Sequence, residues 1–122
     1  MHIQKESGNT AISIKAYEPG KLTISGAEYD YPLLLSANGL TAFTATEDFS
    51  QLTAHHLESL VETDTEILLL GSGEKHQFLP ANQTAQLIER GTAVECMSTR
   101  NACHTFQVLA YEKRKVIALL FP

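Results

Sequence analysis

The fold of this chain is decided by residues 67–106, which read ILLLGSGEKHQFLPANQTAQLIERGTAVECMSTRNACHTF. An apolar run, Ile67–Leu70, leads into the loop Gly71-Ser72-Gly73, and a helix then ends before Gly91. A second apolar run, Ala93–Met97, follows, and another helix begins at Thr99. This alternation of strand and helix predicts two parallel strands whose carboxyl ends face one crevice.

Two apolar runs predict the interior of the sheet. Ile67–Leu70 is continuously apolar rather than alternating, and Val116–Phe121 has the same character. Such runs are typical of strands that are covered on both faces. We therefore expect a layered structure, with helices packed on a central sheet.

Three segments are predicted to be helical. Thr53 is a good N-cap for a helix through Glu62, a second helix follows Pro80, and Ser98 or Thr99 caps a third. The apolar faces predicted from helical spacing are Ala81, Ala85 and Ile88 in the second helix, and Ala102, Phe106 and Leu109 in the third.

The N-terminal part is predicted to contain an antiparallel β-hairpin. Ala11–Tyr17 and Leu22–Ser25 alternate between apolar and polar residues on either side of the turn Pro19-Gly20. A third strand is predicted over Tyr29–Leu35, where Pro32 would make an edge or a bulge because proline has no N–H for a ladder.

Length, composition and charge narrow the function classes. With 122 residues, 43% of them apolar, the chain is expected to form a single domain over residues 1–122. Neither apolar run approaches the roughly 20 residues of a membrane span and no signal peptide begins the chain, so we expect a cytoplasmic protein without membrane insertion.

The net charge of -5 includes no concentrated basic stripe, so nucleic-acid binding is not expected. Lys113-Arg114-Lys115 is better explained as the cationic end of a helix.

The cysteines and histidines predict no metal and no cofactor. Cys96 and Cys103 are seven residues apart and match neither a CxxC motif nor paired zinc ligands, which favours two reduced, buried thiols. The adjacent His55 and His56 project about 100° apart on a helix and have no acidic partner at ligand spacing.

The glycine loop invites comparison with nucleotide-binding motifs. His76 stands where the dinucleotide fingerprint has its third glycine, and the helix after Pro80 starts too late to reach a pyrophosphate. Lys75 is not followed by the Ser or Thr of a P-loop. A glycine turn that leaves a buried strand is the favoured interpretation, with nucleotide binding as the alternative.

The same crevice can be interpreted as an anion site. If the two strands are parallel neighbours, the glycine loop and a helix N-terminus converge there, and two basic side chains can add positive charge. No catalytic residue is assigned, because Ser72 lacks the GxSxG elbow and Cys103 and His104 lie on different helix faces. The candidate ligand-binding residues are Gly71, Ser72, Gly73, Lys75, Thr99 and Arg100.

A series of short segments between residues 68 and 120 forms a recognisable pattern: Leu68–Lys75, Phe78-Leu79-Pro80, Arg90-Gly91, Val94–Thr99, Ala102-Cys103, Thr105-Phe106, Val108-Leu109 and Val116–Leu120. These segments resemble the Mth-type domain family, which includes the adipogenesis-associated Mth-domain proteins and the mitochondrial respiratory complex I assembly factor three. The resemblance implies a three-layer α/β fold with a mixed central sheet, and it implies no established reaction.

Four polar positions depart from the family pattern. Ser72 stands where a threonine is usual, Ser98 where an aspartate is usual, His104 where an arginine is frequent and Gln107 where an asparagine is frequent. The absence of the aspartate at position 98 and of the arginine at position 104 weakens the expectation that a family-wide polar site is intact in this chain.

Two function hypotheses follow. The first is a non-catalytic cytoplasmic accessory or assembly protein that acts through contacts with an unknown protein partner. The alternative is a small-molecule anion-binding protein, or an enzyme, that uses the crevice between Gly71–Gly73 and Thr99. The first predicts an exposed apolar patch away from the glycine loop, whereas the second predicts a concave pocket with convergent polar groups.

Overall fold

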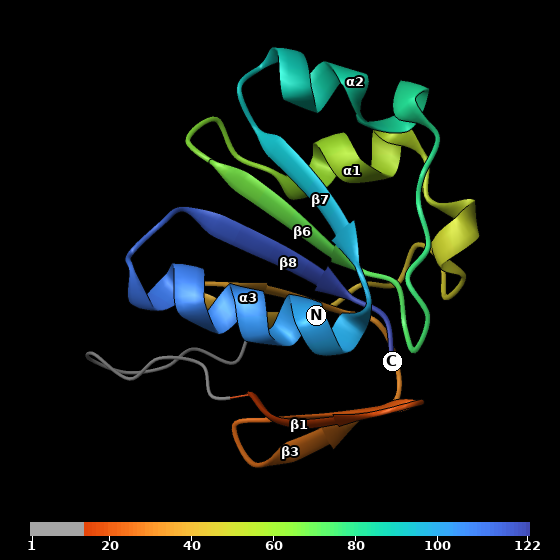
Figure 1. Ribbon diagram of the computed structural model, residues 1–122, viewed down its shortest axis with the longest axis vertical. Coiled ribbons are helices and arrows are strands. Elements are labelled where there is room, and N and C mark those ends of the chain that lie inside the picture. The colour runs from red at the N-terminus through yellow and green to blue at the C-terminus, as the bar shows by residue number, and fades with distance from the viewer. Residues whose placement is uncertain (1–13) are drawn as a thin grey trace.

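The computed structural model describes residues 14–122. Figure 1 shows the arrangement of its helices and strands. In chain order the elements are β1 (Ile14–Glu18), β2 (Lys21–Ile24), β3 (Ala27–Tyr29), β4 (Leu33–Ser36), β5 (Gly39–Ala42), the 3-10 helix η1 (Phe49–Gln51), α1 (Ala54–Leu60), β6 (Ile67–Gly71), α2 (Ala81–Glu89), β7 (Ala93–Met97), α3 (Thr99–Tyr111) and β8 (Val116–Leu120).

The two continuously apolar runs form neighbouring interior strands of a five-stranded sheet. The strand order is β5-β4-β8-β6-β7, so β6 and β8 both have a strand on either side. β6 is parallel to β7 and to β8, whereas β4 is antiparallel to β8 and to β5. The predicted parallel pair and the mixed central sheet are confirmed.

Alternate residues of the interior strands pack into two separate cores. Leu68 and Leu70 contact the core that contains Leu57 of α1 and Leu87 of α2. Leu69 instead belongs to the core that contains Phe106 of α3. Figure 1 accordingly shows α1 and α2 on one side of the sheet and α3 on the other. The predicted layered α/β architecture is confirmed.

The predicted N-terminal hairpin is formed by β1 and β2, which are joined at the Pro19-Gly20 turn. The predicted residues 11–13 lie outside the described part of the chain. β3 completes a separate three-stranded antiparallel sheet. Tyr17 and Leu22 of this sheet share a core with Phe106, so the small sheet packs on the α3 side of the molecule.

The prediction of one strand over Tyr29–Leu35 is wrong. β3 ends at Tyr29, and β4 begins at Leu33 in the other sheet. Pro32 lies between the two strands and has no N–H to donate to a ladder. Its carbonyl instead accepts a hydrogen bond from the Phe43 N–H at 2.9 Å, which closes the end of the β4–β5 hairpin.

The predicted Thr53 cap of α1 is confirmed. The Thr53 hydroxyl oxygen accepts from the His56 N–H at 3.2 Å, and His56 Nδ1 accepts from the Thr53 N–H at 3.1 Å. This is a capping box in which histidine replaces the usual Glu or Gln. The helix ends at Leu60 rather than at Glu62.

The apolar face predicted for α2 is wrong. Ala81, Ala85 and Ile88 are exposed, and Ile88 keeps 56% of its surface accessible. The inward face instead contains Leu87, which is 1% exposed, and Gln83, whose Oε1 accepts from the Ala54 N–H at 2.7 Å. A polar side chain is directed inward because it satisfies one of the free amides at the start of α1.

Candidate functional site

The predicted crevice lies where β6 and β7 end, and it is closed by close packing. A Cβ atom on Gly71 would lie 2.9 Å from the Thr99 hydroxyl and 3.1 Å from the Ala102 Cβ. Only glycine therefore allows the first turn of α3 to pack this closely against the end of β6. Gly71, Ser72, Gly73 and Thr99 are all buried.

Thr99, at the start of α3, is hydrogen-bonded both to the glycine loop and to the residue that follows β8. Its hydroxyl donates to the Phe121 carbonyl at 2.6 Å and accepts from the Gly73 N–H at 2.7 Å. Its own N–H donates to the Gly73 carbonyl at 2.9 Å. The amides of Gly73 and Thr99 thus already have protein acceptors, and the helix is capped by Ser98, whose side chain accepts from the Asn101 N–H.

Ser72 holds the glycine loop in shape. Its hydroxyl donates to the Lys75 carbonyl at 2.6 Å and accepts from the Gln77 N–H at 2.9 Å. Its N–H donates to the Met97 carbonyl at 2.9 Å. These contacts make Ser72 a structural group of the loop.

The two predicted basic residues are exposed. The Arg100 guanidinium lies over the ring of Tyr17, 5.4 Å from its centroid, in a cation–π contact with β1. Lys75 contributes its backbone carbonyl to the Ser72 hydroxyl. The structure therefore brings together Gly71, Ser72, Gly73 and Thr99, while the Arg100 side chain is engaged with the small sheet. Anion binding at this crevice stays a prediction.

The two cysteines are free and differ in burial. Cys103 is 5% exposed, and its burial raises the pKa of the thiol to about 12. Cys96 is half-buried rather than fully buried, and burial raises its pKa as well. His104, the neighbour of Cys103 in α3, is exposed. Neither thiol is poised as a thiolate nucleophile, because the thiolate form is the reactive one.

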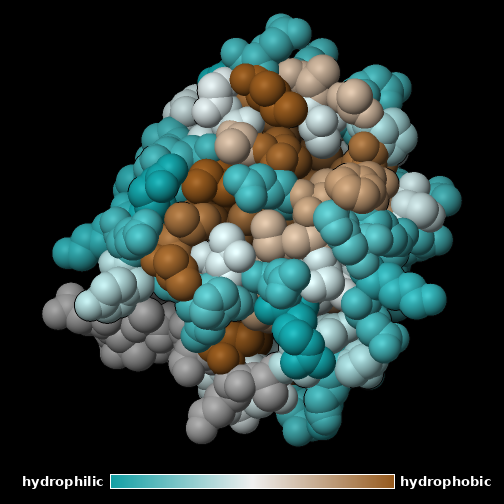
Figure 2. Space-filling view, viewed as in Figure 1, coloured by the Kyte–Doolittle hydropathy of each residue, from teal (hydrophilic) through white to brown (hydrophobic). Residues whose placement is uncertain are grey.

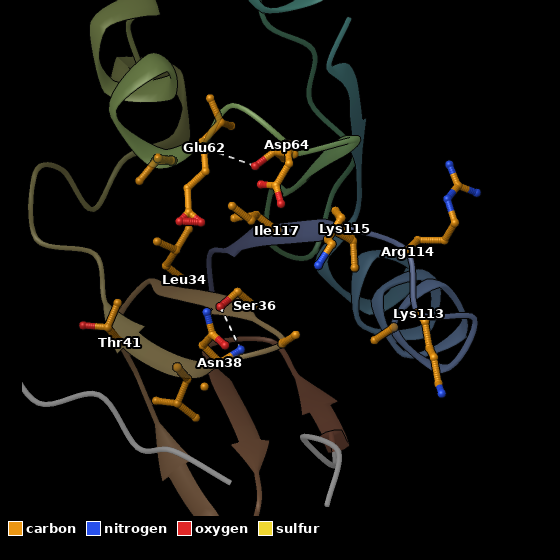
Figure 3. A pocket seen from close by; sticks show the side chains of 18 of the residues that line it. Leu34, Ser36, Asn38, Thr41, Glu62, Asp64, Lys113, Arg114, Lys115 and Ile117 are labelled. Atoms are coloured by element: carbon orange, nitrogen blue, oxygen red, sulfur yellow. Dashed lines mark hydrogen bonds between the residues drawn. The ribbon is translucent and has the colours of Figure 1, made fainter. Parts of the chain in front are cut away.

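A cavity of about 670 Å³ opens at the opposite end of the sheet, near the beginning of β8. Figure 3 shows its three walls, which are the β4–β5 hairpin, the end of α1 with the following loop, and the turn from α3 to β8. Its polar lining includes Ser36 and Asn38 of the hairpin, and Glu62 and Asp64 of the loop. Sequence reasoning missed this cavity, because no local motif joins residues from three separate segments.

Glu66 ties two of these walls together. Its carboxylate accepts from Arg114 Nε at 2.8 Å and from the Lys115 N–H at 3.1 Å. These two hydrogen bonds, first that of the Lys115 amide and then that of Arg114, lower the pKa of the Glu66 carboxyl. The loop before β6 is thereby fixed to the turn before β8.

A second surface feature surrounds β7, which is an edge strand of the sheet. α2 packs against β7 and carries the exposed residues Ala81, Ala85 and Ile88. We call these three residues and β7 the α2–β7 surface. Figure 2 shows hydrophobic residues on this face of the molecule, between the regions of α2 and α3. Its end at Met97 adjoins the glycine loop through the Ser72 N–H, whereas the α2 side chains lie away from that loop in sequence. Within residues 14–122, no further strand pairs with the outer edge of β7.

The arrangement of a mixed five-stranded sheet, a small antiparallel sheet and helices on both faces defines an Mth938-like α/β domain. A crystal structure of a Bordetella parapertussis protein matches with a TM-score of 0.85 at 26% identity, covering 94% of this chain and 99% of that one. The Mth938-like domain of a Bordetella pertussis protein matches with a TM-score of 0.79 at 20% identity, covering 100% and 92% of the two chains. Residues 14–121 match the family described as protein of unknown function, DUF498/DUF598, and the chain belongs to that family.

Relatives carry two different names. The "13 kDa major membrane protein" of Francisella tularensis subsp. holarctica is 30% identical over 121 residues, which is 98% of each chain. Human NADH dehydrogenase (ubiquinone) 1 alpha subcomplex assembly factor 3 is 29% identical over 126 residues, covering 98% of this chain. The chain spans only 65% of the length of that assembly factor. The resemblance to the Mth-type family is confirmed, and the family has no established function.

None of the helices in residues 14–122 combines the length and apolarity needed to cross a membrane. Within the same residues, no three or more His, Cys, Asp and Glu side chains are grouped so that they could hold a metal ion.

Proposed function

We propose that the protein is a non-catalytic cytoplasmic accessory or assembly protein that acts by binding another protein through the α2–β7 surface. The observation that carries this proposal is the apolar helix stripe Ala81, Ala85 and Ile88, which is exposed beside an open sheet edge. Apolar residues at helical spacing normally face a core. In α2 the three apolar residues have this helical spacing, but no other part of residues 14–122 covers them.

The open edge of β7 supports the same conclusion. Natural proteins usually protect an edge strand by covering, shortening or charging it, because its free N–H and C=O groups can pair with another chain. β7 has five residues, of which Glu95 is the one charged side chain. A partner strand could extend the sheet at β7 while an apolar side chain rests on Ile88, which is a known mode of recognition.

Similarity adds a further argument. The name of the human relative describes a protein that assists the assembly of a larger complex, and its similarity covers 98% of this chain. An assembly role requires a binding surface and no chemistry of its own. Buried, hydrogen-bonded groups at the glycine loop and two protonated thiols fit such a role better than they fit catalysis.

The test is capture of the partner from the native cells with three tagged proteins: the unchanged chain, Ile88→Lys and Val108→Lys. Val108 is a matched control, because it is an exposed apolar residue, 43% accessible, on the helix α3. We expect one partner to be recovered with the unchanged protein and with Val108→Lys, and lost with Ile88→Lys. Equal recovery with all three proteins, or recovery of none, would contradict the proposal.

A further inference from the structure

The cavity at the beginning of β8 has the size and lining of a small-molecule site. Its volume of about 670 Å³ falls within the range of roughly 300 to 1,000 Å³ that is typical of ligand pockets. It lies at the opposite end of the sheet from the glycine loop and involves none of the α2–β7 surface. Any ligand here would therefore be independent of the proposed protein contact.

The floor of the cavity is hydrocarbon. Val116 and Ile117 of β8 are buried, whereas Leu34, Leu60 and Val61 around them are only half-buried. Three large aliphatic side chains from β4 and the end of α1 thus remain partly in contact with water. An apolar body placed in the cavity would complete their burial, which is favourable in proportion to the area removed from water.

Two acidic residues, Glu62 and Asp64, and three basic residues, Lys113, Arg114 and Lys115, line the cavity, and they differ in where their charged ends are directed. Figure 3 shows Glu62 and Asp64 extending from the loop after α1, and neither carboxylate forms an ion pair with any residue of the described chain. Lys113 and Arg114 are directed away from the cavity in the same view. Arg114 is in addition paired with Glu66. Lys115 is the basic side chain that is directed toward the cavity, so two carboxylates face one ammonium group.

The acidic wall is held in position before any ligand arrives. The Glu62 N–H donates to the Thr65 hydroxyl oxygen at 2.9 Å, and the Thr65 carbonyl accepts from the Thr92 hydroxyl at 2.9 Å. The Glu66 carboxylate then fixes the end of this loop to Arg114 and Lys115. A preformed wall loses little conformational freedom on binding, which favours affinity.

From this geometry we propose that the cavity binds a small organic ammonium compound with an apolar body. The protonated amine lies against the carboxylates of Glu62 and Asp64, and the hydrocarbon part rests on Leu34, Leu60 and Val61. Charge-assisted hydrogen bonds of an ammonium group to carboxylates are stronger than neutral ones, and they exclude a carboxylate ligand of the same shape.

The experiment is a titration of isotopically labelled protein, followed by amide chemical shifts, with three probes of matched shape. These are 2-phenylethylamine, which is cationic, 2-phenylethanol, which is neutral, and 3-phenylpropanoate, which is anionic. We expect saturable shifts at residues 34–41, 59–65 and 110–117, with the amine bound at least tenfold more tightly than the carboxylate. The proposal is overturned if the anionic or neutral probe binds as tightly as the amine, if shifts saturate elsewhere, or if no probe saturates.

Two double variants separate this site from general attraction to an acidic protein. Glu62→Gln with Asp64→Asn removes both cavity carboxylates, while Glu47→Gln with Glu58→Gln removes the same charge from residues that do not line the cavity. All four side chains are at least partly exposed, so both double variants are expected to fold. We expect the first to weaken amine binding at least tenfold and the second to leave it within twofold. An equal loss in both, or in neither, would reject the assignment.

Discussion

Gly71 at the end of β6 and Thr99 at the start of α3 are in direct contact, with no room for a side chain between them. A Cβ on Gly71 would lie 3.0 Å from the Thr99 Cα and 2.9 Å from its hydroxyl oxygen. The Thr99 Cα is part of the backbone, so a side-chain rotation cannot relieve the contact. The end of the central strand and the beginning of the last helix therefore form one rigid joint.

Gly71→Ala is expected to destabilise the protein by roughly 1 to 3 kcal/mol, the usual cost of overpacking a tightly packed core. The helix must move away from the sheet to admit the methyl group. Equilibrium unfolding in urea measures this cost directly. A free energy of unfolding within 0.5 kcal/mol of the unchanged protein would show that α3 is not packed on Gly71 as described.

Thr99→Val is expected to cost about 2 to 6 kcal/mol, since it leaves two buried polar groups without a partner and each costs roughly 1 to 3 kcal/mol. The two groups are the Phe121 carbonyl and the Gly73 N–H, which both hydrogen-bond to the Thr99 hydroxyl. Thr99→Ser is the matched control, because it keeps the hydroxyl and loses one methyl group, worth roughly 1 kcal/mol. Thermal unfolding should rank the serine variant clearly above the valine variant, and the reverse order would refute the hydrogen-bond assignment.

The thiols should be poorly reactive in the folded protein. Burial raises the pKa of Cys103 to about 12 and raises that of Cys96 to a smaller extent, so both are protonated at pH 8. The thiolate is the form that reacts with a disulfide reagent. We expect slow labelling at pH 8, faster at Cys96 than at the buried Cys103, and complete labelling on unfolding in guanidinium. Rapid reaction of Cys103 in native protein would contradict its burial.

The hydrogen bonds of the Glu66 carboxylate to Arg114 and Lys115, which we call the Glu66 clamp, predict that the stability of the protein depends on pH. The folded pKa of Glu66 lies below the ordinary value of 4.5, because the Lys115 amide and then Arg114 favour the ionised carboxylate. A group with a lowered folded pKa stabilises the protein above its unfolded pKa, and the contribution is lost as the pH falls through the folded pKa. The difference in stability between the unchanged protein and Glu66→Gln should therefore be present at pH 6 and shrink below about pH 4.5. Denaturant unfolding at a series of pH values measures it, and a difference that stayed constant down to pH 3 would argue against the clamp.

The interior strands could be predicted from the sequence because each consists of consecutive apolar residues. Ile67–Leu70 and Val116–Phe121 have no polar face, and only a strand covered on both sides accommodates such a run. The N-caps of α1 and α3 could also be predicted from neighbouring residues, since the Thr53 and Ser98 side chains each accept a hydrogen bond from the amide three residues later. Features of this kind need no knowledge of the rest of the chain.

The errors arose where a distant partner decides the outcome. Gln83 faces inward because it meets the Ala54 amide, a contact between residues 29 positions apart that no periodicity reveals. With Gln83 facing inward, Ala81, Ala85 and Ile88 face outward. Their helical spacing was identified correctly, but the prediction that this face of α2 is buried was wrong. The cavity could not be predicted either, because Leu34, Glu62 and Lys115 meet only after the sheet has assembled.

The strand order also has a consequence for how the chain is made. β8 is synthesised after every other strand of the five, yet it lies between β4 and β6 and is the element that joins them. Until it emerges, the β4–β5 hairpin and the β6–β7 pair are two unconnected pieces that expose Leu33, Leu35, Leu68 and Leu70, residues with no exposure in the finished fold. Contacts between residues so distant in sequence form slowly, because the intervening chain must first lose its freedom. Until β8 is inserted, these apolar side chains lack their final covering, and the pairing of this five-residue strand with both β4 and β6 completes the sheet.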